Sequence, residues 1–119
     1  MKNFAKARDV INRNESAVVV FTKGIHLNFD SSGNGESGKW VLNPIKLETV
    51  DKVIIYLRDE SKKVNKIYSA HYSSYRKSDV PRRYFILFSK IEEVGRTLSN
   101  WMDFAESDQN PVSYITTYN

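Results

Sequence analysis

The chain has 119 residues with a formal net charge of +4, and 40% of its residues are hydrophobic and 27% charged, as in ordinary globular proteins. This length suits one folding unit, so we predict a single domain over residues 1–119. The chain has no cysteine, which excludes disulfides and thiolate chemistry, and no run of signal-peptide or membrane-span length, so we expect a cytoplasmic protein without a membrane partner.

The first third of the chain predicts a helix, two strands and a loop. Apolar residues recur at helical spacing over residues 2–13, which predicts an amphipathic helix. The continuous β-branched run over residues 17–21 predicts a strand buried on both faces. Alternation of apolar and polar residues over 25–29 predicts a half-buried strand. Residues 30–39 carry no apolar side chain and predict a surface loop.

The rest of the chain predicts more strands and a second short helix. Asn100 is suited to cap a helix over residues 101–106, because Asp103 follows three residues later and the apolar residues share one face. Short strands are predicted at residues 40–42, 50–58, 64–74, 84–88 and 112–117.

The number of strands decides the predicted fold class. Six or seven short strands are too many for a flat open sheet in so small a domain. We therefore predict an α+β fold, in which a small, strongly curved sheet or β-barrel is flanked by two short helices.

Charge is distributed unevenly along the chain. Residues 58–83 hold eight basic side chains against three acidic ones, whereas residues 91–119 hold five acidic side chains against one basic one. Tyrosines are interleaved with the basic residues, and such mixtures bind nucleic acids because cations neutralise phosphates while rings stack on unpaired bases. The same pattern also fits strand tyrosines that pack beside a solvated basic face. The predicted backbone contacts are Lys62, Lys63, Lys66, Arg76, Lys77, Arg82 and Arg83.

No motif in the sequence requires catalysis or a cofactor. Residues 33–38 match the spelling G-x-G-x-x-G, but the residues that follow reach Asn43-Pro44 too soon for a phosphate-binding helix, so we interpret them as a hairpin loop. His26 and His71 are the only histidines, too few for a typical zinc site. We predict no catalytic residues, no metal and no cofactor.

Residues 38–90 resemble the PUA-like superfamily, including its EVE and ASCH branches. The resemblance is carried by Gly38-Lys39-Trp40, by the strand over 50–56, by Ile67-Tyr68-Ser69-Ala70 and by the strand over 83–88. It implies a small β-barrel with flanking helices that binds RNA or modified DNA and holds a base in an aromatic pocket. The sequence departs from the pattern at Val50, where the family has a glycine before aspartate.

The resemblance and the aromatic residues together suggest which side chains contact a base. The resemblance implies that Trp40, Tyr56 and His71 lie near the pocket, and Tyr68 joins them from the interleaved tyrosines. The segments Asn100-Trp101 and Asn110-Pro111 have no chemical role in this reading.

Three functional hypotheses follow from these patterns. The first is a noncatalytic nucleic-acid-binding module that recognises an unpaired or modified base. The alternative is a small regulatory protein, an inhibitor or adaptor, whose charge asymmetry guides it to a protein partner or a second copy of itself. The third is an enzyme acting on nucleic acid through His71, for which the sequence identifies no partner carboxylate.

Overall fold

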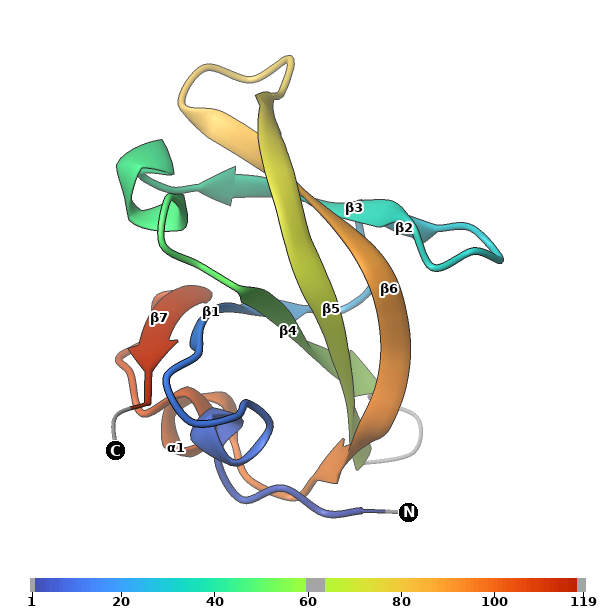
Figure 1. Ribbon diagram of the computed structural model, residues 1–119, viewed down its shortest axis with the longest axis vertical. Coiled ribbons are helices and arrows are strands. Elements are labelled where there is room, and N and C mark those ends of the chain that lie inside the picture. Colours follow the sequence, from blue (N-terminus) through green and yellow to red (C-terminus); the bar gives the residue numbers. More distant parts are fainter. Residues whose placement is uncertain (1, 60–63, 118–119) are drawn as a thin grey trace.

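A computed structural model describes residues 2–59 and 64–117 and shows one mixed seven-stranded sheet (Figure 1). The strand order is β2-β3-β6-β5-β4-β1-β7, with β1 parallel to β4 and every other neighbouring pair antiparallel. The elements in chain order are η1 (Ala7–Asp9), β1 (Ser16–Thr22), β2 (Leu27–Phe29), β3 (Gly35–Val41), η2 (Pro44–Leu47), β4 (Lys52–Asp59), β5 (Val64–Lys77), β6 (Arg83–Thr97), α1 (Trp101–Ala105) and β7 (Val112–Thr116).

Strand β1, which lies next to the edge strand β7, is buried on both faces, as its sequence predicts. Successive side chains of a strand point to opposite faces, so Val19 enters one hydrophobic core while Val18 and Val20 enter another. On the adjacent strand, Tyr56 belongs to the first core and Ile55 to the second. The continuous apolar runs of β1 and β4 therefore supply two cores at once.

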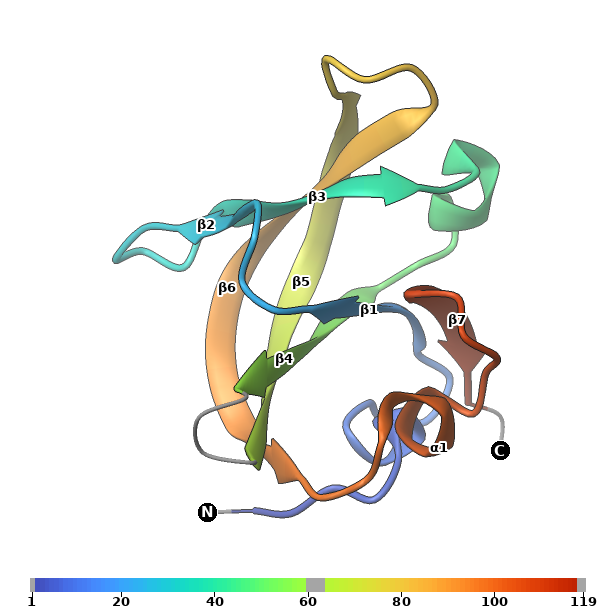
Figure 2. The same ribbon diagram turned by 180° about the vertical axis from the view of Figure 1, so that it is seen from behind.

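The first core is covered by the N-terminal segment and α1. Phe4, Ala7 and Ile11 pack on this face together with Phe104 of α1, and all four are buried. Viewed from behind, the N-terminal segment and α1 lie together below β1 and β4 (Figure 2). This packing places α1 next to the ends of these two strands.

The second core is enclosed because the sheet bends over itself. Ile86 and Phe88 of β6 belong to the same core as Val18 of β1 and Leu47 of η2. The long strand β6 forms an arc in Figure 1, and its register with β5 shifts at three places. Such irregularities bend strands and increase their twist, which lets one sheet wrap around a core.

The predicted α+β fold is wrong in two respects. Within the described residues, β2 and β7 remain the two edges of an open sheet, so the barrel does not close. The predicted helix over 2–13 is only the single 3-10 turn η1, because the chain before it is extended and Asn3 forms a β-bridge with Arg96. The helical spacing of the apolar residues over 2–13 instead reflects an irregular segment that turns Phe4 and Ala7 toward the core. The fold is thus mostly β, and its described part has α1 as its only α-helix.

The predicted loop over residues 30–39 is also wrong in its second half, where β3 begins at Gly35. Two glycines here allow close packing. A Cβ atom on Gly35 would lie 2.6 Å from Cβ of Phe29, and one on Gly38 would lie 2.5 Å from the ring of Phe85. The absence of a side chain at these two glycines therefore permits close packing within the sheet, whereas the sequence pattern predicted only a surface loop.

The remaining predictions of elements agree with the structure in place and differ in length. The helix at residue 101 is confirmed, and the Oδ1 atom of Asn100 caps it by accepting the backbone N–H of Asp103 at 2.9 Å. The strands predicted at 64–74 and 84–88 extend to 64–77 and 83–97. None of the described helices is long and apolar enough to cross a membrane.

Candidate functional site

Three adjoining hollows lie where the parallel strands β1 and β4 end. Phe21 is in register with Tyr56, and Thr22 with Leu57, so the carboxyl ends of both strands meet here. Arg58 is the last residue but one of β4 and lines all three hollows. The topology of the sheet places the hollows here, because two neighbouring parallel strands have their carboxyl ends on the same side of the sheet.

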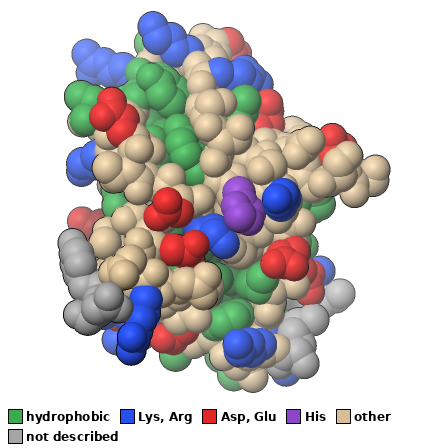
Figure 3. All heavy atoms as spheres, in the orientation of Figure 1, with side chains coloured by type: hydrophobic (Ala, Val, Ile, Leu, Met, Phe, Trp, Pro, Cys, Tyr) green, Lys and Arg blue, Asp and Glu red, His purple; other side chains and the backbone are tan. Residues whose placement is uncertain are grey.

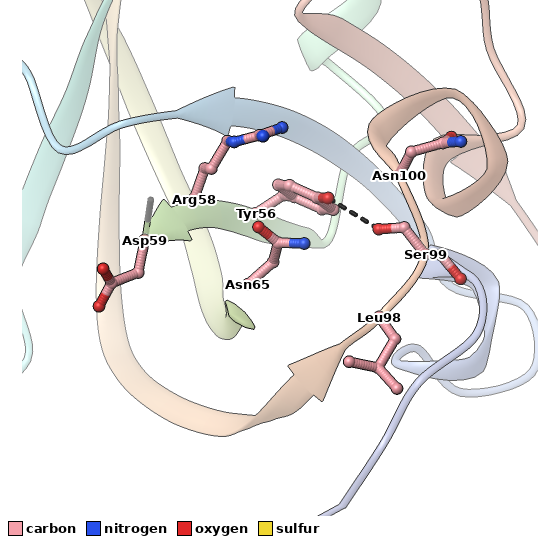
Figure 4. Close-up of a pocket in the computed structure, with 7 residues that line it drawn as sticks. All are labelled: Tyr56, Arg58, Asp59, Asn65, Leu98, Ser99 and Asn100. Atoms are coloured by element: carbon pink, nitrogen blue, oxygen red, sulfur yellow. Dashed lines mark hydrogen bonds between the residues drawn. The ribbon is translucent and has the colours of Figure 1, made fainter. Parts of the chain in front are cut away.

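The first of these, which we name the polar hollow, has a volume of about 480 Å³ (Figure 4). Tyr56 lies at its base and donates its hydroxyl hydrogen to the backbone oxygen of Ser99 at 2.7 Å. Asn65 of β5 stands directly opposite Arg58 in the sheet and donates through Nδ2 to the Thr97 oxygen at 3.5 Å. Figure 4 shows Arg58 and Asn100 on the upper side of this hollow, near β1 and α1.

The second, the apolar hollow, has a volume of about 360 Å³ and lies between β1 and α1. Its walls include Phe21, Trp101, Met102 and Pro111, and it shares Arg58 with the polar hollow. The Trp101 ring meets Phe21 edge to face with centroids 5.8 Å apart. The indole N–H donates to the Asn110 oxygen at 2.8 Å, which fixes the ring beside the hollow.

Arg58 and Asn100 line both the polar and the apolar hollow, and we call these two hollows together the cleft. Arg58 is exposed, and no hydrogen bond or ion pair joins its guanidinium to another residue in the described part of the chain. Burial raises the pKa of Tyr56, and the positive charge of Arg58 offsets part of that rise. The cleft therefore presents a guanidinium without a hydrogen-bond or ion-pair partner among the described residues, and Asp59 adds a carboxylate to the lining of the polar hollow.

The third hollow, of about 430 Å³, adds two lysines near Arg58. Lys23 and Lys66 line it together with Asp59. Lys66 also lies 3.8 Å from a carboxylate oxygen of Glu93, so its charge is partly balanced. This arrangement keeps positive charge around the cleft without a large uncompensated excess.

The four side chains predicted to bind a base do not converge. Tyr56 alone lines the cleft, where it belongs to the first core. Trp40 packs against the second core and donates its indole N–H to the Ser37 hydroxyl at 3.0 Å. His71 is exposed midway along β5, and Tyr68 donates to Glu93 at 3.3 Å. Trp40 and Tyr68 both pack against the second core, whereas Tyr56 belongs to the first, because neighbouring strand positions point to opposite faces.

The predicted backbone contacts fall at the two ends of β5. Lys66 lies beside the cleft, whereas Arg76, Lys77, Arg82 and Arg83 lie at the β5–β6 turn. Lys66 and Arg76 are ten positions apart on β5, which corresponds to about 33 Å along an extended strand. Figure 3 shows Lys and Arg side chains at the upper end of the molecule and acidic side chains among them on the face below. Lys62 and Lys63 lie outside the described residues.

Several of the basic side chains at that turn already have partners. Arg76 donates to Glu36 at 2.8 Å, with its guanidinium carbon 4.0 Å from the centre of the Phe85 ring. Arg83 donates to the Lys39 backbone oxygen at 3.1 Å. These contacts hold the turn against β3 and leave Lys77 and Arg82, both exposed, as its outermost cations.

The cleft contains residues that the sequence patterns did not single out for binding, above all Phe21, Arg58, Asn65 and Trp101. For Phe21 and Arg58 the available signal is position, since they stand near the ends of the two most hydrophobic strands. That signal becomes informative only when the strands are known to be parallel. The Asn100-Trp101 segment, without a role in the sequence, forms part of both walls.

The cleft offers hydrogen-bonding amides, aromatic faces, the guanidinium of Arg58 and the carboxylate of Asp59. Among the described residues, no three His, Cys, Asp or Glu side chains gather closely enough to hold a metal ion. Comparisons of the chain with protein-family models, with curated proteins and with solved structures found no match. The similarity of residues 38–90 to the PUA-like superfamily therefore stays a prediction.

Proposed function

We propose that the protein is a noncatalytic nucleic-acid-binding module that accepts an unpaired or modified base in the cleft. The observation that carries the proposal is the unpaired guanidinium of Arg58, set between the aromatic wall at Trp101 and the amide of Asn65. Nucleic acids offer the matching groups, because each unpaired base has a flat face to stack and a polar edge beside a phosphate.

The surroundings of the cleft support an anionic ligand of this kind. Lys23 and Lys66 line the hollow next to Arg58 together with Asp59, and these two lysines lie where the backbone of a bound strand would continue. Phosphate contacts of this type position a strand, while contacts to the base edge supply selectivity. The resemblance to the PUA-like superfamily points in the same direction, although the residues around the base differ from those it implies.

A binding measurement with a matched variant tests the proposal. Fluorescence anisotropy would be recorded with labelled single-stranded and duplex RNA and DNA at about 25 mM salt, where phosphate contacts are strong. We expect single strands to bind more tightly than duplexes, because only an unpaired base enters the cleft without the cost of extrusion. We expect Arg58→Gln to weaken binding about tenfold through the lost charged contact.

Arg13→Gln serves as the control. Arg13 is also exposed and precedes β1, so it lies away from the end of the strand that carries the cleft. The control should change affinity by less than about twofold, since both variants lose one positive charge and only Arg58 lines the cleft. If no form of RNA or DNA binds at low salt, the proposal is wrong, and the protein-partner alternative takes its place. Equal losses for the two variants would place binding elsewhere.

A further inference from the structure

We propose that the ligand of the cleft is a dinucleotide unit of a single strand, with one nucleoside in each hollow and the linking phosphate on Arg58. This inference rests on the proposed function and specifies what the site holds. It follows from a feature that recognition of a single base does not use, namely that two hollows of comparable size share Arg58 and Asn100.

Size supports two occupants in place of one. The polar and apolar hollows have volumes of about 480 and 360 Å³, and each alone lies in the usual range of small-ligand sites. A single base would fill one hollow and leave the other to water. A dinucleotide has the matching form, because a charged phosphate joins two uncharged nucleosides.

The apolar hollow suits a stacked base. Phe21, Trp101 and Pro111 present little polar surface, and the indole nitrogen is already engaged with Asn110. The ring of Trp101 is therefore held in place before a ligand arrives, which reduces the entropy lost on binding. Stacking on such a wall accepts any base, since every base has a π-face.

The polar hollow suits the hydrogen-bonding edge of the second base. The Oδ1 atom of Asn100 accepts from the Asp103 N–H, which leaves its Nδ2 as a donor with a fixed orientation. The Nδ2 atom of Asn65 donates to Thr97, which leaves its Oδ1 as an acceptor. One donor and one acceptor from two held amides match the alternating groups on a base edge.

Arg58 then lies where it can bind the phosphate that links the two nucleosides. Its guanidinium presents five N–H donors, and phosphate oxygens pair with this group in a bidentate manner. Because no ion pair joins it to a described residue, the guanidinium is available to a ligand without breaking an existing ion pair.

Ligands that differ only at the linkage test this assignment with the unmodified protein. Affinities would be measured by isothermal titration for adenosine, for the dinucleoside monophosphate ApA and for its methylphosphonate analogue, which has an uncharged linkage. We expect ApA to bind at least about tenfold more tightly than adenosine, and the methylphosphonate to lose most of that gain. Arg58→Gln should reduce the affinity for ApA to that for the methylphosphonate. Arg58→Lys should retain part of the higher affinity for ApA.

The outcomes separate this inference from the proposed function. If a 10-mer single strand binds while adenosine, ApA and the methylphosphonate have equal affinities, the dinucleotide assignment is overturned and the nucleic-acid module stands. If the 10-mer does not bind either, both fail. Met102→Ala and Leu98→Ala, each at an exposed side chain lining one hollow, give a second readout that does not involve Arg58. Weaker binding of ApA by both variants supports occupation of both hollows, and an effect of only one overturns it.

Discussion

Replacement of Tyr56 by phenylalanine isolates the hydrogen bond at the base of the polar hollow. Tyr56 is fully buried, and its hydroxyl donates to the Ser99 backbone oxygen at 2.7 Å. A hydrogen bond of this type contributes about 0.5–1.5 kcal/mol to the free energy of unfolding. The Ser99 oxygen borders the hollow, so water can replace the lost donor, and we expect a cost near about 1 kcal/mol without the larger penalty of a dry, unpaired carbonyl.

The loss is measured by urea unfolding of the purified variant. It should appear as a lower midpoint concentration of urea, with no change in the dependence of the free energy of unfolding on urea concentration. For a domain of this size, the expected loss corresponds to a decrease of about 4 °C in melting temperature. Tyr68→Phe is the matched control, because it also removes one tyrosine hydroxyl, but its acceptor is the exposed carboxylate of Glu93 at 3.3 Å. The control should cost less than about 0.5 kcal/mol. Equal losses for the two variants would refute the reasoning, as would a Tyr56→Phe variant as stable as the parent.

Three further changes test the packing and the titrating groups. A Cβ on Gly95 would lie 2.7 Å from the ring of Phe4, so Gly95→Ala should lower the free energy of unfolding by about 1–3 kcal/mol and speed hydrogen exchange in residues 2–11. Burial raises the pKa of Tyr114, so stability should fall as pH rises above about 10, and Tyr114→Phe should reduce that slope in alkaline urea titrations. Hydrogen bonding to Lys6 lowers the pKa of Glu106, so its contribution is present above the ordinary carboxyl range and is lost on acidification; Glu106→Gln should flatten the acid limb of stability against pH.

The sequence predicts elements well where a local pattern decides them. The β-branched run of β1 and the Asn100 cap of α1 lie where expected, because burial on both faces and a side-chain cap are both local properties. The N-terminal helix fails for the converse reason. Phe4 and Ala7 do reach the core, but the bridge from Asn3 to Arg96 joins residues 93 positions apart, and no local pattern reports such a contact.

Whether the predicted binding residues lie together depends on which face of the sheet each side chain occupies, and a sequence pattern does not report this. Trp40 and Tyr56 both lie on strands and both are aromatic, yet they belong to opposite faces of the sheet. Composition predicts that aromatic and basic residues are abundant, but convergence depends on strand order. The cleft exists because β1 and β4 run parallel although they are separated by two other strands in sequence.

The same distinction applies to charge. A count along the sequence describes the middle of the chain as strongly basic, whereas the folded sheet brings acidic residues from other strands beside these cations. Glu36 of β3 pairs with Arg76, and Glu93 of β6 lies near Lys66. Screening limits the reach of the remaining surface charges to about 10 Å at ordinary salt. Attraction for a polyanion is thereby concentrated at cations without an ion-pair partner among the described residues, such as Arg58, which lines the same hollow as the aromatic ring of Trp101.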